Sequence, residues 1–123
     1  VKLMIPFRSD EKTSHEASMS YMGRTLKAGV EVLQYTKGFL HSKTLVIDDE
    51  IGIIGSANID LRSFEQNFEV SAFIYDEKHS KHLKELFLKD RKTCKKLSLY
   101  KWSHRPKYRK VIQSLARLLS PIL

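Results

Sequence analysis

Residues 41–58 read HSKTLVIDDEIGIIGSAN, and this stretch decides the fold of the segment around it. Two apolar runs, residues 44–47 and 51–54, are separated by the acidic trio of residues 48–50. Short apolar runs separated by turn-forming residues are typical of a β-hairpin. The stretch therefore predicts two antiparallel strands, followed by the polar loop of residues 55–58.

Four polar residues of this stretch are candidates for chemistry: His41, Lys43, Ser56 and Asn58. Side chains two residues apart share one face of a strand, so His41 and Lys43 are predicted to point into one pocket. Histidine suits nucleophilic attack or proton transfer near neutral pH, because both of its protonation states are accessible there. Lys43 supplies a cation for phosphate oxygens, and the loop offers a hydroxyl, an amide and backbone N–H groups to an anion. Together these groups predict an oxyanion site that needs no metal.

The flanking sequence predicts an α/β fold in which a mixed β-sheet is flanked by helices. Apolar runs predict strands over residues 1–6, 30–35 and 68–75. Helical spacing of apolar residues predicts helices over residues 14–27, capped by Ser14, over 77–100, and over 108–119 before Pro121. Because a strand, a helix and a strand open the chain in that order, we expect a parallel crossover unit there.

Length and composition indicate one domain over residues 1–123. Hydrophobic residues make up 41% of the chain and charged residues 29%, as is usual for a folded domain. The single cysteine, Cys94, excludes an internal disulfide and a thiolate metal site. No apolar run reaches the roughly 20 residues that cross a bilayer. The apolar, strand-like start at Val1 leads us to interpret the chain as a fragment of a longer protein.

Basic residues are concentrated in the last third of the chain. Residues 1–77 hold 8 Lys and Arg against 12 Asp and Glu, whereas residues 78–123 hold 14 against 2. Such a basic segment is consistent with a solvated helix face. It is equally consistent with contact to a phosphate-rich surface, either nucleic acid or anionic lipid, and both interpretations stay open.

The arrangement His41-x-Lys43, then Asp48, then Gly55-Ser56-x-Asn58 resembles the HKD signature of the phospholipase D superfamily, and every spacing matches. In that family two such motifs meet across a pseudo-two-fold axis. One histidine attacks phosphorus to give a phosphohistidine, and the other protonates the leaving alcohol.

The resemblance implies that this chain carries half of such a site. It implies catalytic roles for His41, Lys43 and Asp48, substrate-phosphate binding by Ser56 and Asn58, and no cofactor or metal. Asp48 is expected to be structural more than chemical, because it lies at the far end of the strand from His41.

Glu69, within Asn67-Phe68-Glu69, is a further candidate. Members of the superfamily place a carboxylate at this point against the catalytic imidazole. A carboxylate that accepts from the second ring nitrogen fixes the tautomer and stabilises imidazolium, so Glu69 is predicted to orient His41. The alternative is an exposed glutamate on a strand.

Several phrases narrow the resemblance to the carboxy-terminal part of bacterial cardiolipin synthases, including its second HKD motif. They are Ala28-Gly29-Val30, Gly38-Phe39-Leu40-His41, the run from Gly55 to Phe64, Asn67-Phe68-Glu69, Ser20-Tyr21, and the closing Arg117-Leu118-Leu119-Ser120-Pro121. The resemblance implies a parent enzyme that converts two phosphatidylglycerol molecules to cardiolipin plus glycerol. It implies location at the cell membrane with a cytoplasm-facing catalytic domain, and a membrane anchor outside this chain.

The implied partners are phosphatidylglycerol, an anionic membrane surface and an amino-terminal HKD half, while nucleic acid is not expected. The isolated chain is therefore expected to be inactive alone. Two alternatives come from other classes. One is a superfamily nuclease that completes its site by homodimerisation, with the basic segment on a phosphate backbone. The other is a catalytically silent interaction domain that keeps the motif.

Overall fold

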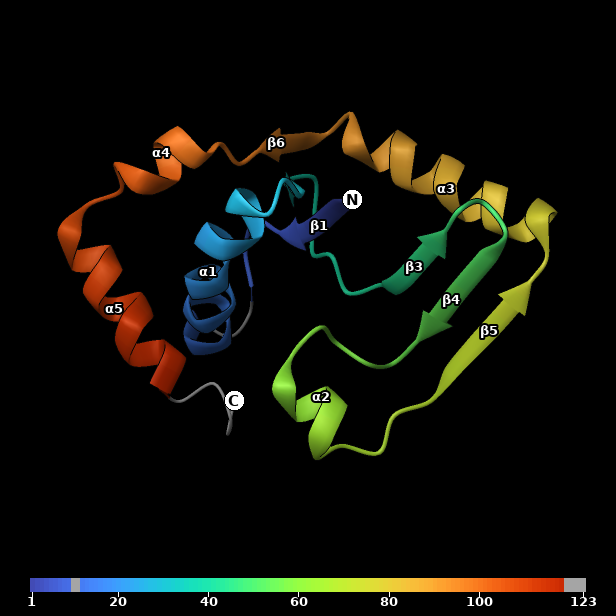
Figure 1. Cartoon of the computed structure of the whole chain (residues 1–123), viewed down its shortest axis with the longest axis horizontal. Helices are drawn as coiled ribbons and strands as arrows, with labels where there is room; N and C mark the ends of the chain where they lie inside the picture. The colour runs from blue at the N-terminus through green and yellow to red at the C-terminus, as the bar shows by residue number, and fades with distance from the viewer. Residues whose placement is uncertain (10–11, 119–123) are drawn as a thin grey trace. The chain divides into compact units, whose positions relative to one another are not determined.

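The computed structural model describes residues 1–9 and 12–118 (Figure 1). The chain divides into two compact units, Val1–Leu40 with Cys94–Leu123 and His41–Thr93. Each unit contains one three-stranded β-sheet and its own helices. The predicted α/β class, with helices flanking mixed β-structure, is confirmed, although the strands form two sheets. That residues 1–123 make a single domain stays a prediction.

The first unit opens with β1 (Lys2–Pro6), α1 (Lys12–Lys27) and β2 (Glu31–Tyr35). β1 pairs with β2 in parallel, which confirms the predicted crossover. Ser14 was predicted as the helix cap, and this is wrong because α1 already includes Lys12. The apolar periodicity begins later in the helix, so the polar first turn gave no signal.

Residues beyond Arg91 depart from the predicted helix over 77–100. α3 (Glu77–Arg91) is followed by β6 (Cys94–Lys96) and then by α4 (Leu99–Ser103). β6 pairs antiparallel with β2, and the Leu97 N–H donates to the Val32 carbonyl at 2.9 Å. This pairing satisfies backbone groups on the second edge of β2. A partner about 60 residues away in sequence leaves no trace in local periodicity.

The core of the first unit forms where α1 and α4 pack on the sheet. Its buried members are Met19, Met22, Val32 and Trp102. Their removal from water is the main favourable contribution to the stability of this unit.

α5 (Lys107–Leu118) completes the first unit and packs against α1. Gln113 of α5 donates through Nε2 to Glu16 Oε2 at 2.9 Å. The predicted helix over 108–119 is therefore confirmed up to Leu118, whereas Leu119 and Pro121 lie outside the described residues. Across residues 1–9 and 12–118, no helix is both long enough and apolar enough to span a bilayer.

The second unit is built on an antiparallel sheet in the order β3-β4-β5. Its elements are β3 (Lys43–Ile47), β4 (Ile51–Gly55), α2 (Leu61–Glu65), β5 (Ser71–Tyr75) and α3. The predicted hairpin is confirmed, because β3 and β4 pair around a turn in which the Glu50 N–H donates to the Ile47 carbonyl. The strand predicted over 68–75 is shorter than expected, since β5 begins at Ser71.

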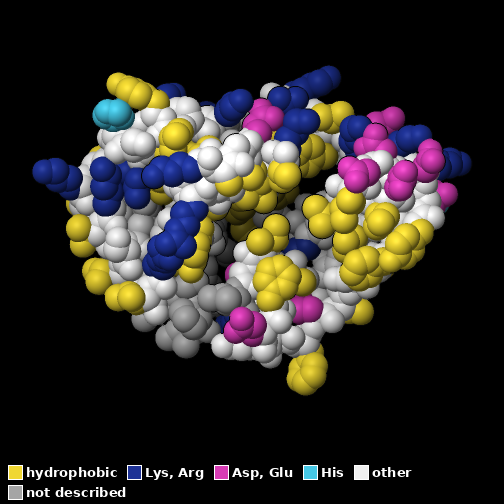
Figure 2. Space-filling model, in the orientation of Figure 1, with side chains coloured by type: hydrophobic (Ala, Val, Ile, Leu, Met, Phe, Trp, Pro, Cys, Tyr) yellow, Lys and Arg dark blue, Asp and Glu magenta, His cyan; other side chains and the backbone are white. Residues whose placement is uncertain are grey.

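One face of this sheet is packed and the other is open. α3 contacts all three strands, and Val46, Gly52 and Ile74 share one rung of the face that is partly or fully buried. Because side chains alternate between the two faces along each strand, the residues next to these three point to the opposite face. That face carries Leu45, Ile47, Ile51, Ile53, Phe73 and Tyr75. Four of these, Leu45, Ile47, Phe73 and Tyr75, are exposed, and Figure 2 shows hydrophobic side chains gathered over the β3–β5 region at the right.

Candidate functional site

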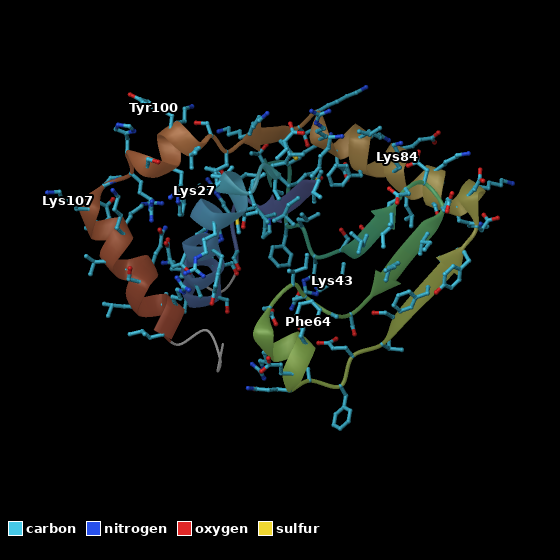
Figure 3. The ribbon with its side chains drawn as sticks, in the orientation of Figure 1. Lys27, Lys43, Phe64, Lys84, Tyr100 and Lys107 are labelled. Carbon is cyan, nitrogen blue, oxygen red and sulfur yellow. The ribbon has the colours of Figure 1, made fainter. Side chains whose placement is uncertain are left out.

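The hairpin brings the two halves of the predicted motif side by side. Lys43, the first residue of β3, pairs directly with Gly55, the last residue of β4. Ser56 and Asn58 follow Gly55, and His41 precedes Lys43 by two residues. Residues that are 12 or more apart in sequence therefore meet at one end of the sheet, where Figure 3 labels Lys43.

His41 lies in an exposed segment before β3 and not within the strand. The prediction that His41 and Lys43 share one face of a strand is therefore wrong, because His41 lies outside β3. The two residues are linked differently, because the Lys43 ammonium donates to the His41 carbonyl oxygen at 2.8 Å. This bond holds the half-buried lysine against the backbone that carries the imidazole.

Gly55 lets the end of β4 approach the β5 segment closely. A Cβ atom at this position would lie 2.7 Å from the carbonyl oxygen of Val70, closer than real Cβ contacts allow. With no side chain in the way, the Ser56 N–H donates to Val70 O and the Val70 N–H donates to Ser56 Oγ, both at 3.0 Å. The first bond fixes the backbone of Ser56 and the second fixes its side chain.

Glu69 accepts a hydrogen bond from the Ser56 hydroxyl. The Ser56 hydroxyl donates to Glu69 Oε2, and Asn67 Nδ2 donates to Oε1 at 3.3 Å. The hydrogen bond from Ser56 is the largest cause that lowers the pKa of Glu69 below its ordinary value of 4.5, and burial opposes it. Bonds from Ser63 and Asn67 and the charge of Lys43 lower the pKa further. Glu69 is therefore a carboxylate at neutral pH.

Glu69 was placed on a strand by the sequence analysis, whereas it lies two residues before β5. Its role in orienting His41 stays a prediction. The bonded carboxylate has a second consequence for Ser56. While Glu69 is ionised, the hydroxyl proton of Ser56 points at the carboxylate and is not offered to another anion.

Asn58 is positioned by α2, which the sequence analysis missed. Its backbone N–H donates to Ser63 Oγ at 3.1 Å, and the Ser63 N–H donates to Asp60 Oδ1 at 2.7 Å. Asp60 caps the N-terminus of α2, and Ser63 is buried. Ser63 and Asn67 are thus positioning residues that the sequence pattern did not indicate, although Asp60 directly before this short helix was a usable capping signal.

Asp48 lies at the other end of β3 from Lys43. Five strand steps separate the two residues, roughly 17 Å along the chain. Asp48 and Asp49 have φ angles of 50° and 62°, in the left-handed region that aspartate tolerates better than most residues. That Asp48 is structural more than chemical stays a prediction.

The described residues hold no group of three or more His, Cys, Asp or Glu side chains that could bind a metal ion. Metal independence stays a prediction. The chemistry that the arrangement offers comes from its own side chains. The pairing of β3 with β4 brings the residues that carry an imidazole, an ammonium, an amide and an ionised carboxylate to one end of the sheet.

The first unit contains a basic pocket that the sequence did not predict. It has a volume of about 630 Å³ and lies where the parallel strands β1 and β2 end. Three cations, Arg8, Lys37 and Lys95, line it beside Phe7, and the Lys95 ammonium lies 5.1 Å from the Phe7 ring centre. Such a lining can hold an anion that carries an apolar group. The usable signal was positional, because residues after two parallel neighbouring strands share one sheet edge.

Comparison with known proteins gives two kinds of similarity. Residues 1–91 match the family described as "Cardiolipin synthase, PLD-like domain". Over all 123 residues the chain is 46% identical to the major cardiolipin synthase ClsA of Bacillus subtilis and 49% identical to cardiolipin synthase 1 of Staphylococcus epidermidis. It spans 26% and 25% of the lengths of these relatives, about a quarter of each.

The fold also resembles a solved structure. The phospholipase D family member Nuc from Salmonella typhimurium superimposes with a TM-score of 0.66 at 18% sequence identity. The match covers 80% of this chain and 64% of Nuc. At that identity the likeness concerns the fold alone.

Proposed function

The chain belongs to the family of phospholipase D-like domains of cardiolipin synthases, and on that premise we propose that it supplies half of the active site of a phosphatidyltransferase. One observation carries the proposal. The pairing of Lys43 with Gly55 brings the His-x-Lys half of the motif beside its Gly-Ser-x-Asn half. The reaction proposed for the whole enzyme joins two phosphatidylglycerol molecules and releases glycerol.

The proposed reaction takes two displacements at phosphorus. In the first, one imidazole nitrogen bonds to phosphorus while the bond from phosphorus to the departing glycerol oxygen breaks, and a second imidazole gives that oxygen a proton. In the second, a hydroxyl of another phosphatidylglycerol bonds to phosphorus and returns a proton to the second imidazole, while the phosphorus–nitrogen bond breaks. His41 supplies one of the two imidazoles, and the partner half supplies the other.

The remaining side chains act on the charge that develops at phosphorus. Lys43 offers its ammonium and Asn58 its amide to the phosphate oxygens. The Ser56 hydroxyl can donate to phosphate only after its hydrogen bond to Glu69 has broken, because the two side chains are hydrogen-bonded in the free protein. Glu69 is proposed to orient His41 once that bond opens, and its lowered pKa supports a carboxylate in this role.

The proposed partners follow from the same reaction. Phosphatidylglycerol and an anionic membrane surface supply the substrate, and a second HKD half completes the site. The enzyme is proposed to work at the cell membrane with its catalytic domain facing the cytoplasm and its anchor outside this chain. The basic segment of residues 78–123 supports contact with anionic lipid.

Two assays on the full-length protein test the proposal. Radiolabelled phosphatidylglycerol in detergent micelles, resolved by thin-layer chromatography, should yield labelled cardiolipin together with free glycerol. A plasmid-nicking assay run beside it should show no cleavage. Nicking without cardiolipin formation would replace the proposal with the homodimeric nuclease. If neither cardiolipin nor nicked plasmid forms, the result favours a silent interaction domain.

A further inference from the structure

We propose that α5 docks on the surface of an anionic lipid bilayer, lying along the headgroup region with its apolar side inward. This inference deepens the proposed function, because it names the element that meets the membrane. It rests on how α5 is held in the first unit and on what α5 leaves uncovered. Its binding readout needs no turnover, so it can fail separately from the transfer reaction.

The outward side of α5 is apolar. Five residues at helical spacing remain exposed: Tyr108 (62%), Val111 (58%), Ile112 (48%), Leu115 (59%) and Leu118 (77%). At 3.6 residues per turn these positions fall within an arc of about 120°. A stripe of that width is what a surface helix normally turns toward a protein core. Here it faces away from its own unit.

The side of α5 that faces α1 is anchored by a polar residue instead. Gln113 is only 2% exposed, donates to Glu16 at 2.9 Å, and accepts from Arg105 Nε at 2.9 Å. Ala116 is buried beside it, and the Arg117 guanidinium lies 5.0 Å from the Tyr21 ring centre. A buried glutamine with partners at both its Nε2 and its Oε1 fixes the rotation of the helix, because turning it away would break its hydrogen bonds to Glu16 and Arg105.

The charge of α5 indicates which kind of surface its exposed side would bind. Residues 107–118 contain Lys107, Arg109, Lys110 and Arg117 and no acidic residue. Arg117 lies against Tyr21 of α1, so a second copy of the outward surface would bring Lys107, Arg109 and Lys110 against the same three cations. An anionic headgroup layer instead neutralises the cations while the apolar stripe enters the acyl boundary, as interfacial helices do. Figure 2 shows basic and hydrophobic side chains together over the α5 region at the left, and Figure 3 labels Lys107 there.

Vesicle flotation of the 123-residue chain tests this surface, because lipid-bound protein rises with the vesicles whereas self-associated protein does not. Binding is expected on vesicles that contain phosphatidylglycerol, and it should fall at least tenfold on pure phosphatidylcholine or in high salt. Val111→Ser with Leu115→Gln should lower binding to phosphatidylglycerol vesicles at least tenfold. Lys110→Glu should lower it several-fold, and it leaves the contact with α1 untouched. Phe68→Ser is the matched control, because it removes a fully exposed apolar side chain outside α5.

The outcomes separate the rival occupants. If Phe68→Ser lowers binding as much as the α5 variants, the association is unspecific and the proposal fails. It also fails if binding ignores lipid charge, or if the α5 variants turn a dimer into a monomer in analytical ultracentrifugation while vesicle binding persists. Fluorescence of Trp102, the single tryptophan, reports whether each variant is folded. If the Val111→Ser/Leu115→Gln variant is misfolded, the vesicle binding of Lys110→Glu decides the test, and unchanged binding of that variant refutes the proposal.

Discussion

The hydroxyl of Ser56 donates to Oε2 of Glu69, joining the end of β4 to the segment that precedes β5. Both residues were predicted from the sequence as separate groups, one for phosphate and one for the imidazole. Their direct bond makes the state of each depend on the other. A phosphate that accepts the hydrogen bond of the Ser56 hydroxyl would release the carboxylate of Glu69. If Glu69 orients His41 as proposed, substrate binding and the orientation of His41 are then coupled.

Ser56→Ala should raise the pKa of Glu69 toward its ordinary value of 4.5, because it removes the largest cause of the lowered value. The side-chain carboxyl ¹³C shift, followed by NMR against pH, measures this directly. A lowered pKa in the folded state means that Glu69 contributes stability above the unfolded value of 4.5. That contribution is lost as the pH falls through the folded value. Thr44→Ala in the same sheet is the control, and an unchanged Glu69 titration in Ser56→Ala would contradict the bond.

The hairpin could be predicted from sequence because its signals are local. The apolar runs that became β3 and β4 and the Asp48-Asp49 turn lie within a few residues of each other. The motif spacing then located His41, Lys43, Ser56 and Asn58 near one strand end. The local pattern did not predict where β3 begins. The strand starts at Lys43, and His41 lies outside it.

Non-local pairing explains the larger misses. β6 exists because Cys94 to Lys96 complete the edge of β2, and a basic, Leu-containing segment gives no sign of that partner. The bond of Ser56 to Glu69 likewise joins residues 13 apart, across a helix that was not predicted. Neither hydrophobic period nor motif spacing contains this information.

His41→Ala in the full-length protein should reduce cardiolipin formation by at least about a hundredfold, because the reaction loses its nucleophile or its leaving-group acid. Product counts from labelled phosphatidylglycerol measure the loss. His82→Ala, which removes an exposed imidazole from α3, should leave the rate near the wild-type value. Comparable rates for the two variants would remove His41 from the chemistry.

Lys43→Met and Asn58→Ala should each lower kcat by about 10² to 10³, as expected for the loss of one donor to a developing oxyanion. KM should change less, since the lost interactions strengthen in the transition state. Lys78→Met provides the control for a lysine outside the site. A rise in KM with unchanged kcat would assign Lys43 and Asn58 to ground-state binding only.

Gly23→Ala should destabilise the chain even though alanine favours helices. A Cβ at this position in α1 would lie 2.7 Å from Nε1 of Trp102, whose ring is buried and has the Arg105 guanidinium 3.8 Å from its centre. Overpacking typically costs about 1–3 kcal/mol, which exceeds the gain of about 0.5–1 kcal/mol from replacing a helical glycine. Urea unfolding followed by Trp102 fluorescence measures the sum. Ser18→Ala, exposed in the same helix, should stay within about 0.5 kcal/mol of wild type, and a stabilised Gly23→Ala would refute the packing argument.

The 123-residue chain by itself should form no cardiolipin, because it contains one complete HKD motif, the one that begins at His41, and the two proposed displacements need two imidazoles. The open face of the β3-β4-β5 sheet, with Leu45, Phe73 and Tyr75 exposed, should also make the isolated chain self-associate. Leu45→Ser with Phe73→Ser should lower the self-associated fraction in analytical ultracentrifugation, whereas Phe68→Ser should not.

Co-expression with the amino-terminal half should restore transfer and suppress self-association together, if that half covers the open sheet face while it brings the second imidazole. Restored transfer with unchanged self-association would separate the two roles and move the docking surface elsewhere. Cardiolipin formed by a soluble monomer of residues 1–123 would defeat the half-site argument. A homodimer that nicks plasmid DNA would replace it, because two copies of His41 would then face each other across a true two-fold axis.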